Sequence, residues 1–249
     1  MPGILYHILA TFRILFENWK LFLPLALIMS VVAVATIAGL NETSVVFSSV
    51  IFLVLWLTTI FILRQRMAGH QLKLRDALYN AMTPLIQTFV VFLAAVFECL
   101  PIFIVVIAYS TALETDLFAL PFYAFLFLVF AGVMILLSAY LLSSTLIALI
   151  AVSAPGIYPV PAFKAATELM MGRKVKFVLR LIALLLFLGA IWAAIMVPLA
   201  MLLAVAAPVA LAVIEILACF SSIYVTAYLY LYYRWMLDYD TKGGENDKK

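Results

Sequence analysis

Long stretches without a charged side chain dominate this sequence, and one of them, 118–152, is longer than a lipid bilayer requires. A helix that crosses a membrane needs about 20 consecutive, mostly apolar residues. The runs that meet this requirement are 21–40, 45–63, 84–110, 118–152 and 181–233. The last run is long enough for two helices, and Ala206-Ala207-Pro208 is the best place to divide it. The pattern predicts an all-α, polytopic integral membrane protein with six transmembrane helices.

The amino-acid composition excludes the main alternatives to a membrane protein. Of 249 residues, 68% are hydrophobic and 11% are charged, and the mean hydropathy is +1.24. Soluble domains are about 45–50% apolar and about 25% charged. The chain therefore does not resemble a soluble domain, a disordered protein or a nucleic-acid-binding protein. Its N-terminal segment lacks a basic start and a small-residue cleavage site, so we interpret it as mature sequence rather than a signal peptide.

Basic residues are distributed very unevenly with respect to the predicted spans. With six spans, all 15 Lys and Arg residues fall on one side of the membrane. The opposite loops contain only Glu42, Glu114 and Asp116. Cytoplasmic loops are enriched in Lys and Arg, so both termini are predicted to be cytoplasmic. A different number of spans would scatter the basic residues over both sides.

Many of these basic residues are candidates for contact with anionic lipid headgroups. They lie ahead of or between the spans: Arg13, Lys20, Arg64, Arg66, Lys73, Arg75, Lys164, Arg173, Lys174, Lys176 and Arg180. Near an anionic membrane surface each Lys or Arg contributes about 1 kcal/mol of attraction. The alternative is that they determine topology and do nothing else.

Three cytoplasmic segments, 3–18, 72–83 and 161–171, have the pattern of short amphipathic helices. Such helices lie in the membrane interface with their apolar side toward the lipid. Each precedes a pair of spans, which suggests a threefold pattern with units of about 3–65, 72–153 and 161–236. The chain would then be one membrane domain, 1–237, followed by a polar cytoplasmic tail, 238–249. Alternatively, amphipathic connectors are simply ordinary in proteins built from helical hairpins.

Two acidic residues, Glu98 and Glu215, fall inside predicted spans. Each lies roughly 14 Å from the outer end of its helix, at a rise of about 1.5 Å per residue. Ionisable residues inside a membrane are costly and are functional candidates. We expect no Lys, Arg or His at that depth. The functional hypothesis is a proton- or cation-linked site, and the alternative is two neutral acids that form hydrogen bonds to neighbouring helices.

The sequence gives little indication of metal binding or catalysis. Cys99 follows Glu98, and Cys219 lies one helical turn from Glu215, but buried cysteines are ordinary in apolar helices. No nucleophile, zinc or phosphate-binding motif is present in the sequence. We therefore expect a protein that is not an enzyme, with no cofactor and no metal. The aromatic residues that end the last span are predicted to form an interfacial belt, with a ligand-stacking surface as the alternative: Tyr224, Tyr228, Tyr230, Tyr232, Tyr233 and Trp235.

One region resembles a known family. It comprises Ala148–Val152, Pro155-Gly156-Ile157 and the stretch from Pro161 to Lys174, which reads PAFKAATELMMGRK. It is similar to a region of YciC-like membrane proteins and of the membrane domain attached to some glycerophosphoryl diester phosphodiesterases. Ala166 stands where those families often have Ser. The segment Arg75–Ala81 resembles the corresponding helix before the third span.

The resemblance implies a six-span bacterial inner-membrane protein without a catalytic site, because the phosphodiesterase chemistry lies in a separate soluble domain. The resulting prediction is a non-enzymatic membrane protein that acts through contacts with membrane lipids and a membrane-protein partner. It would organise the membrane or serve as a subunit of a membrane assembly. The alternative is a transporter or channel for a small or amphiphilic molecule that uses Glu98 and Glu215.

Overall fold

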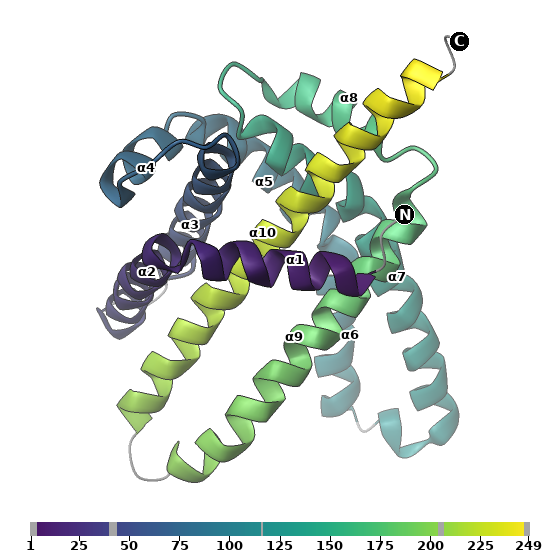
Figure 1. Cartoon of the computed structure of the whole chain (residues 1–249). Helices are drawn as coiled ribbons and strands as arrows, with labels where there is room; N and C mark the ends of the chain where they lie inside the picture. Colours follow the sequence, from purple (N-terminus) through teal and green to yellow (C-terminus); the bar gives the residue numbers. More distant parts are fainter. Residues whose placement is uncertain (1–3, 40–43, 116, 204–206, 247–249) are drawn as a thin grey trace. The chain divides into compact units, whose positions relative to one another are not determined.

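The computed structural model describes residues 4–39, 44–115, 117–203 and 207–246, and this part of the chain is helical and contains no strand (Figure 1). Its α-helices are α1 (Ile4–Glu17), α2 (Trp19–Gly39), α3 (Ser44–Met67), α4 (Leu74–Ala81), α5 (Leu85–Glu98), α6 (Leu100–Glu114), α7 (Pro121–Val152), α8 (Pro159–Leu169), α9 (Lys174–Leu203) and α10 (Ala207–Asn246). A short 3₁₀ helix, η1 (Leu117–Ala119), precedes α7. The all-α prediction is confirmed.

Several helices are long and apolar enough to cross a bilayer. Four do so individually, within α3, α7, α9 and α10. Two further candidates are pairs of helices that meet at a sharp bend, α1 with α2 at 88° and α4 with α5 at 67°. The described residues therefore provide four spans, or up to six if each bent pair counts as one. These helices are typical of a membrane-embedded protein.

The third predicted span, 84–110, is not one continuous helix. Helix α5 ends at Glu98 and α6 begins at Leu100, with Pro101 in its first turn. Proline has no N–H for the hydrogen bond to the preceding turn, and its ring clashes with the carbonyl four residues earlier. The helix therefore breaks at Cys99, and this break leaves Glu98 at a helix end.

The long apolar stretch near the C-terminus forms two helices, as predicted. Helix α9 ends at Leu203 and α10 begins at Ala207. The predicted breakpoint residue Ala206 lies outside the described residues, as do Glu42 and Asp116 of the acidic loops. Helix α10 continues to Asn246, so the described part of the expected polar tail extends the last helix.

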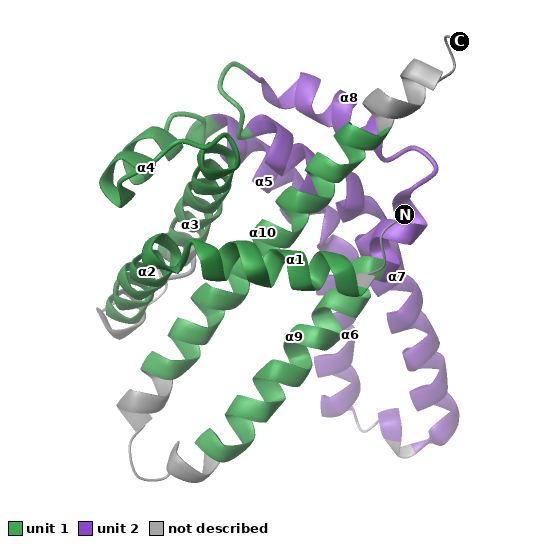
Figure 2. Ribbon diagram, viewed as in Figure 1, with its two compact units in different colours: residues 1–86, 153–156, 180–249 green, residues 87–152, 157–179 purple. Residues whose placement is uncertain are grey.

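The chain divides into two compact units (Figure 2). Unit 1 contains residues 1–86, 153–156 and 180–249, and unit 2 contains residues 87–152 and 157–179. In unit 1, α10 packs against α1, α2 and α3, while α4 packs against α3. In unit 2, α7 packs against α6 and α8.

The three short amphipathic helices are present as α1, α4 and α8. Helix α8 begins at Pro159, two residues before the predicted start, because proline is tolerated in the first turn of a helix. Gly69 and Gly156, which follow α3 and α7, have φ values of +82° and +83°. Glycine adopts this left-handed conformation without steric cost, so each of these long helices ends in a turn that leads into a short one.

Candidate functional site

Glu98 is the predicted site residue with the most polar surroundings. It lies beside the Thr145 hydroxyl of α7, and Lys174 at the start of α9 contributes an electrostatic attraction to it. The Lys174 ammonium itself lies over the Tyr140 ring, with its Nζ 4.7 Å from the ring centroid. All four residues belong to unit 2. Lys174, which the sequence places between two predicted spans, is the first residue of α9.

Several buried oxygen atoms of unit 2 lack a hydrogen-bond partner. They include Glu98 Oε2 and Thr145 Oγ1, together with Thr88 Oγ1 and Ser138 Oγ. Thr88, Ser138 and Thr145 are fully buried. Leaving a buried polar group unsatisfied costs about 1–3 kcal/mol. One Glu98 oxygen therefore remains without a partner, although Thr145 on the neighbouring helix α7 is close enough to influence the carboxyl group.

The other predicted residues are distributed over both units. Cys99, at the break between α5 and α6, is partly exposed and belongs to unit 2. Glu215 is partly buried, and Cys219 is buried one turn further along α10 in unit 1. Among the described residues, no group of three His, Cys, Asp or Glu side chains could hold a metal ion.

A buried aromatic cluster in unit 1 was missed by the sequence analysis. The His7 ring lies edge-on to the rings of Tyr228, Tyr232 and Trp235, at centroid distances of 6.4, 6.1 and 5.9 Å. The Arg180 guanidinium lies over the last two rings, 5.1 and 5.6 Å from their centroids. We call these five residues the His7 cluster. The spacing of 228, 232 and 235 places the three rings on one face of α10, which is the signal that could have revealed it.

This cluster corrects the prediction of an aromatic belt. Tyr224, Tyr228, Tyr230 and Tyr232 are buried, whereas belt residues face the lipid headgroups. Arg180, expected to contact lipid, is buried as well. Burial and the nearby Arg180 charge both lower the pKa of His7, burial having the larger effect. His7 therefore stays neutral at neutral pH.

Helix α1 is fixed to α9 and α10 next to the His7 cluster. The Tyr224 hydroxyl donates a hydrogen bond of 2.9 Å to the Ile8 carbonyl oxygen. Ile8, Leu184, Tyr224 and Tyr228 form a buried apolar core. The polar face expected for residues 3–18 is thus only partly in water, because His7 and Thr11 are buried and Arg13 and Glu17 are exposed.

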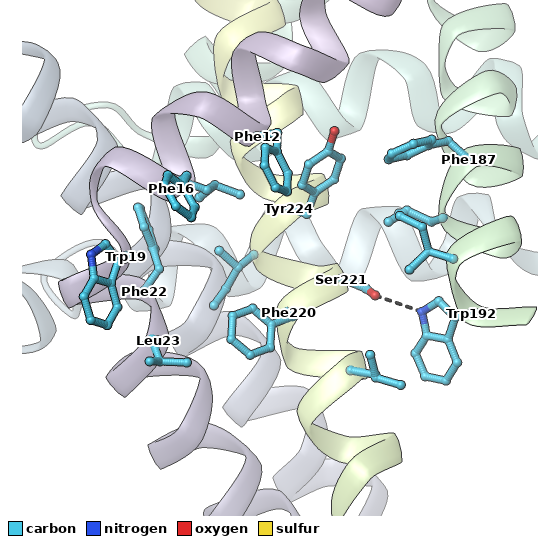
Figure 3. A pocket seen from close by; sticks show the side chains of 15 residues that line it. Phe12, Phe16, Trp19, Phe22, Leu23, Phe187, Trp192, Phe220, Ser221 and Tyr224 are labelled. Atoms are coloured by element: carbon cyan, nitrogen blue, oxygen red, sulfur yellow. Dashed lines mark hydrogen bonds between the residues drawn. The ribbon is translucent and has the colours of Figure 1, made fainter. Parts of the chain in front are cut away.

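An apolar groove of about 360 Å³ opens beside this core, between the α1–α2 bend, α9 and α10 (Figure 3). Aromatic side chains form much of its wall: Phe12, Phe16, Trp19, Phe22, Phe187, Trp192, Phe220 and Tyr224. The Trp192 indole N–H donates a hydrogen bond of 2.8 Å to Ser221 Oγ across the groove. A second cavity of about 380 Å³ lies between α3, α9 and α10 and shares Trp192 and Ser221.

The predicted lipid-contacting residues differ in exposure. Six are exposed: Arg13, Lys20, Lys73, Arg75, Lys164 and Lys176. Four are partly buried: Arg64, Arg66, Arg173 and Lys174. Arg64 donates hydrogen bonds to the Ser153 carbonyl and hydroxyl oxygens, at 3.3 and 3.1 Å, and lines a polar pocket of about 390 Å³ with Asn80 and Thr83.

No family model, no curated protein and no solved structure matches the chain.

Proposed function

We propose that this protein is a non-enzymatic integral membrane protein that acts through contacts with lipids and with a membrane-protein partner. The observation that carries the proposal is the way α1, α4 and α8 are docked. Each buries a pair of residues four positions apart and leaves large apolar side chains exposed, and α1 buries Ile8 in addition to its pair. A helix that is held by one face and apolar on another suits the interface between lipid headgroups and acyl chains.

The docked faces of α4 and α8 are built from alanine. Ala77 and Ala81 of α4 are buried where that helix packs on α3. Ala162 and Ala166 of α8 are buried where that helix packs on α7. Small side chains allow two helix backbones to approach closely, which favours association inside or beside a membrane. In α1 the buried residues are His7, Ile8 and Thr11, and the helix on which α1 packs is α10.

The opposite faces of the short helices are apolar and accessible. On α1, Leu5, Leu9, Phe12 and Phe16 are each more than 60% exposed. Tyr79 on α4, Val160 on α8 and Met171 just after α8 are exposed apolar residues as well. Exposed basic residues accompany them on the same segments: Arg13, Lys73, Arg75 and Lys164. Apolar anchors together with cations favour binding to an anionic membrane surface.

The docking pattern also supports a threefold organisation. A short helix docks on the long helix before it in two cases, α4 on α3 and α8 on α7. Helix α1 is the first of the described helices, and it docks on the last long helix, α10. We propose six spans with both termini in the cytoplasm of a bacterium, as the one-sided basic residues and the YciC-like segment suggest.

Lipid selectivity provides the test. The protein would be reconstituted in nanodiscs of mixed anionic and zwitterionic phospholipid, and the lipids retained after release into mild detergent would be measured by native mass spectrometry. Preferential retention of anionic lipid supports the proposal. Replacing Lys73, Arg75 and Lys164 with Gln should reduce that preference by up to about fivefold per charge. The matched control replaces three basic residues of the C-terminal segment, Lys242, Lys248 and Lys249.

Co-purifying proteins measured in the same experiment would test the second half of the proposal. A stoichiometric membrane-protein partner would make the chain an assembly subunit. Equal retention of both lipid classes and no partner would refute the proposed function.

A second candidate function is transport of a small or amphiphilic molecule through a path that includes Glu98. The observation in its favour is the set of buried oxygen atoms in unit 2 without hydrogen-bond partners, since such groups could bind water or a solute. Cys99 lies next to Glu98 and would report access of water. Rapid reaction of Cys99 with a small hydrophilic thiol reagent, in a Cys219→Ser background, would favour transport, and no reaction would argue against it.

A further inference from the structure

We propose that the apolar groove of unit 1 binds one acyl chain of a membrane phospholipid, whose headgroup phosphate lies near Lys20. This inference deepens the proposed function, on which it rests, because it gives the lipid contact a defined location. The groove lies between the α1–α2 bend, α9 and α10 (Figure 3). It was not anticipated from the sequence, where its aromatic residues are spread over three distant segments.

The chemistry of the groove wall favours a hydrocarbon ligand. Nearly all of its lining side chains are aliphatic or aromatic, and Ser221 and the tips of Tyr224, Trp19 and Trp192 are its polar groups. Three of these four groups already have partners inside the protein. Ser221 accepts the Trp192 N–H, and the Tyr224 hydroxyl donates to the Ile8 carbonyl. A ligand therefore needs no hydrogen bond along the groove, which suits an alkyl chain and disfavours a polar solute.

The position of the groove makes lipid the available ligand. Two of its walls, α9 and α10, are among the helices long and apolar enough to cross a bilayer, and α2 belongs to a bent pair that also qualifies. Its volume of about 360 Å³ lies at the lower end of the range for ligand pockets, about 300–1,000 Å³. An open, apolar hollow between such helices is filled by whatever surrounds them, and in a bilayer that is an acyl chain.

The bend between α1 and α2 brings aromatic side chains of both helices to the groove. Helix α1 turns by 88° from α2, so side chains on both sides of the bend line the same groove: Phe12 and Phe16 of α1, and Trp19 and Phe22 of α2. The two phenylalanine rings are stacked, with centroids 6.3 Å apart. Lys20, next to Trp19, is exposed at the same bend and carries a positive charge suited to a phosphate. Arg13 is also exposed, but its charge is balanced by Glu17 at 2.8 Å.

A photoreactive phospholipid with a diazirine in its acyl chain would test the inference. The full-length protein in nanodiscs containing this lipid would be irradiated, digested and mapped by mass spectrometry. We expect adducts to concentrate on groove residues of three helices, such as Phe16, Ile191 and Leu217. Adducts spread evenly over exposed apolar residues, including Leu186 of α9, would show ordinary bilayer contact and would overturn the inference.

A matched pair of substitutions on α9 sharpens the test. Ile191 lines the groove, so Ile191→Trp should fill part of it and reduce groove adducts at least fivefold. Leu186 is on the same helix, is 70% exposed and does not line the groove, so Leu186→Trp should leave the adducts unchanged. Lys20→Gln should lower the yield less, by about fivefold at most. Equal yields in the two Trp variants would refute the assignment, provided that circular dichroism and thermal unfolding show both to be folded.

Failure of this inference can be separated from failure of the proposed function. Selective retention of anionic lipid without adducts in the groove would leave the proposed function intact and refute only the groove assignment. Crosslinks between two copies of the chain, or to another protein, at Ile191 or Leu217 would show that a helix occupies the groove and would also refute it.

Discussion

Docking of α8 on α7 should fail if a larger side chain is placed in the contact. Ala166 is 1% exposed in the face of α8 that packs on α7, and a Leu there adds three carbon atoms to this buried contact. Overpacking of this kind costs about 1–3 kcal/mol. Ala166→Leu should therefore lower the free energy of unfolding by that amount, which raises the population of undocked α8 by about 5- to 150-fold.

The neighbouring residue Ala165 supplies the control, because it lies on the same helix and is exposed. Ala165→Leu has the same change in volume and helix propensity but should alter the unfolding free energy by less than about 0.5 kcal/mol. Both variants would be unfolded in mixed micelles with increasing denaturing detergent, and protease cleavage within 157–173 would report undocking. Equal destabilisation by the two variants would refute the docking argument.

Three further predictions concern unit 1 and the turn after α7. Tyr224→Phe removes the hydrogen bond to the Ile8 carbonyl and should destabilise the protein by about 1 kcal/mol. Thermal unfolding would measure this loss. An unchanged melting temperature would exclude a role for this bond in holding α1. Gly156 has φ +83°, and a Cβ added there would meet no other atom within 4 Å. Backbone strain alone should therefore make Gly156→Ala cost about 1–2 kcal/mol, and Gly156→Asn should cost less. Equal melting temperatures for the three proteins would contradict this. The His7 cluster should make stability depend on pH. Burial and Arg180 lower the pKa of His7, so the unfolded chain binds a proton more readily, and stability is complete above the model-peptide pKa of about 6.5 and falls as the pH drops below it. His7→Phe should remove this dependence in melting temperatures measured from pH 8 to 5, and identical profiles for the two proteins would refute the assignment.

The helical architecture of the protein could be predicted because a lipid bilayer restricts which backbone structures can cross it. A chain with long uncharged runs must satisfy its backbone hydrogen bonds within each segment, so helices follow from composition and run length. The three short helices could be located from a second signal, the helical periodicity of their apolar and polar residues. The break at Cys99 was harder to foresee, because Pro101 lies within an apolar run that is long enough for a span, and only the structure shows that the helix ends there.

Side-chain surroundings could be predicted much less well. Lys174 was expected between two spans as a lipid contact, and it is the first residue of α9, where its charge acts on Glu98. The tyrosines of α10 were expected in an interfacial belt, and several of them are buried together with His7 because α1 packs on α10. Periodicity identifies which residues share a face of one helix. It does not identify the helix that the face meets.

What the sequence by itself determined is therefore the helical, membrane-embedded class of the protein and the approximate positions of most of its helices, since these depend on local composition and on the cost of burying backbone groups in lipid. What only the tertiary structure decided is the apolar groove, the His7 cluster and the polar surroundings of Glu98. Each of these combines residues from helices far apart in the chain, and such contacts depend on helix packing and on the 88° bend between α1 and α2.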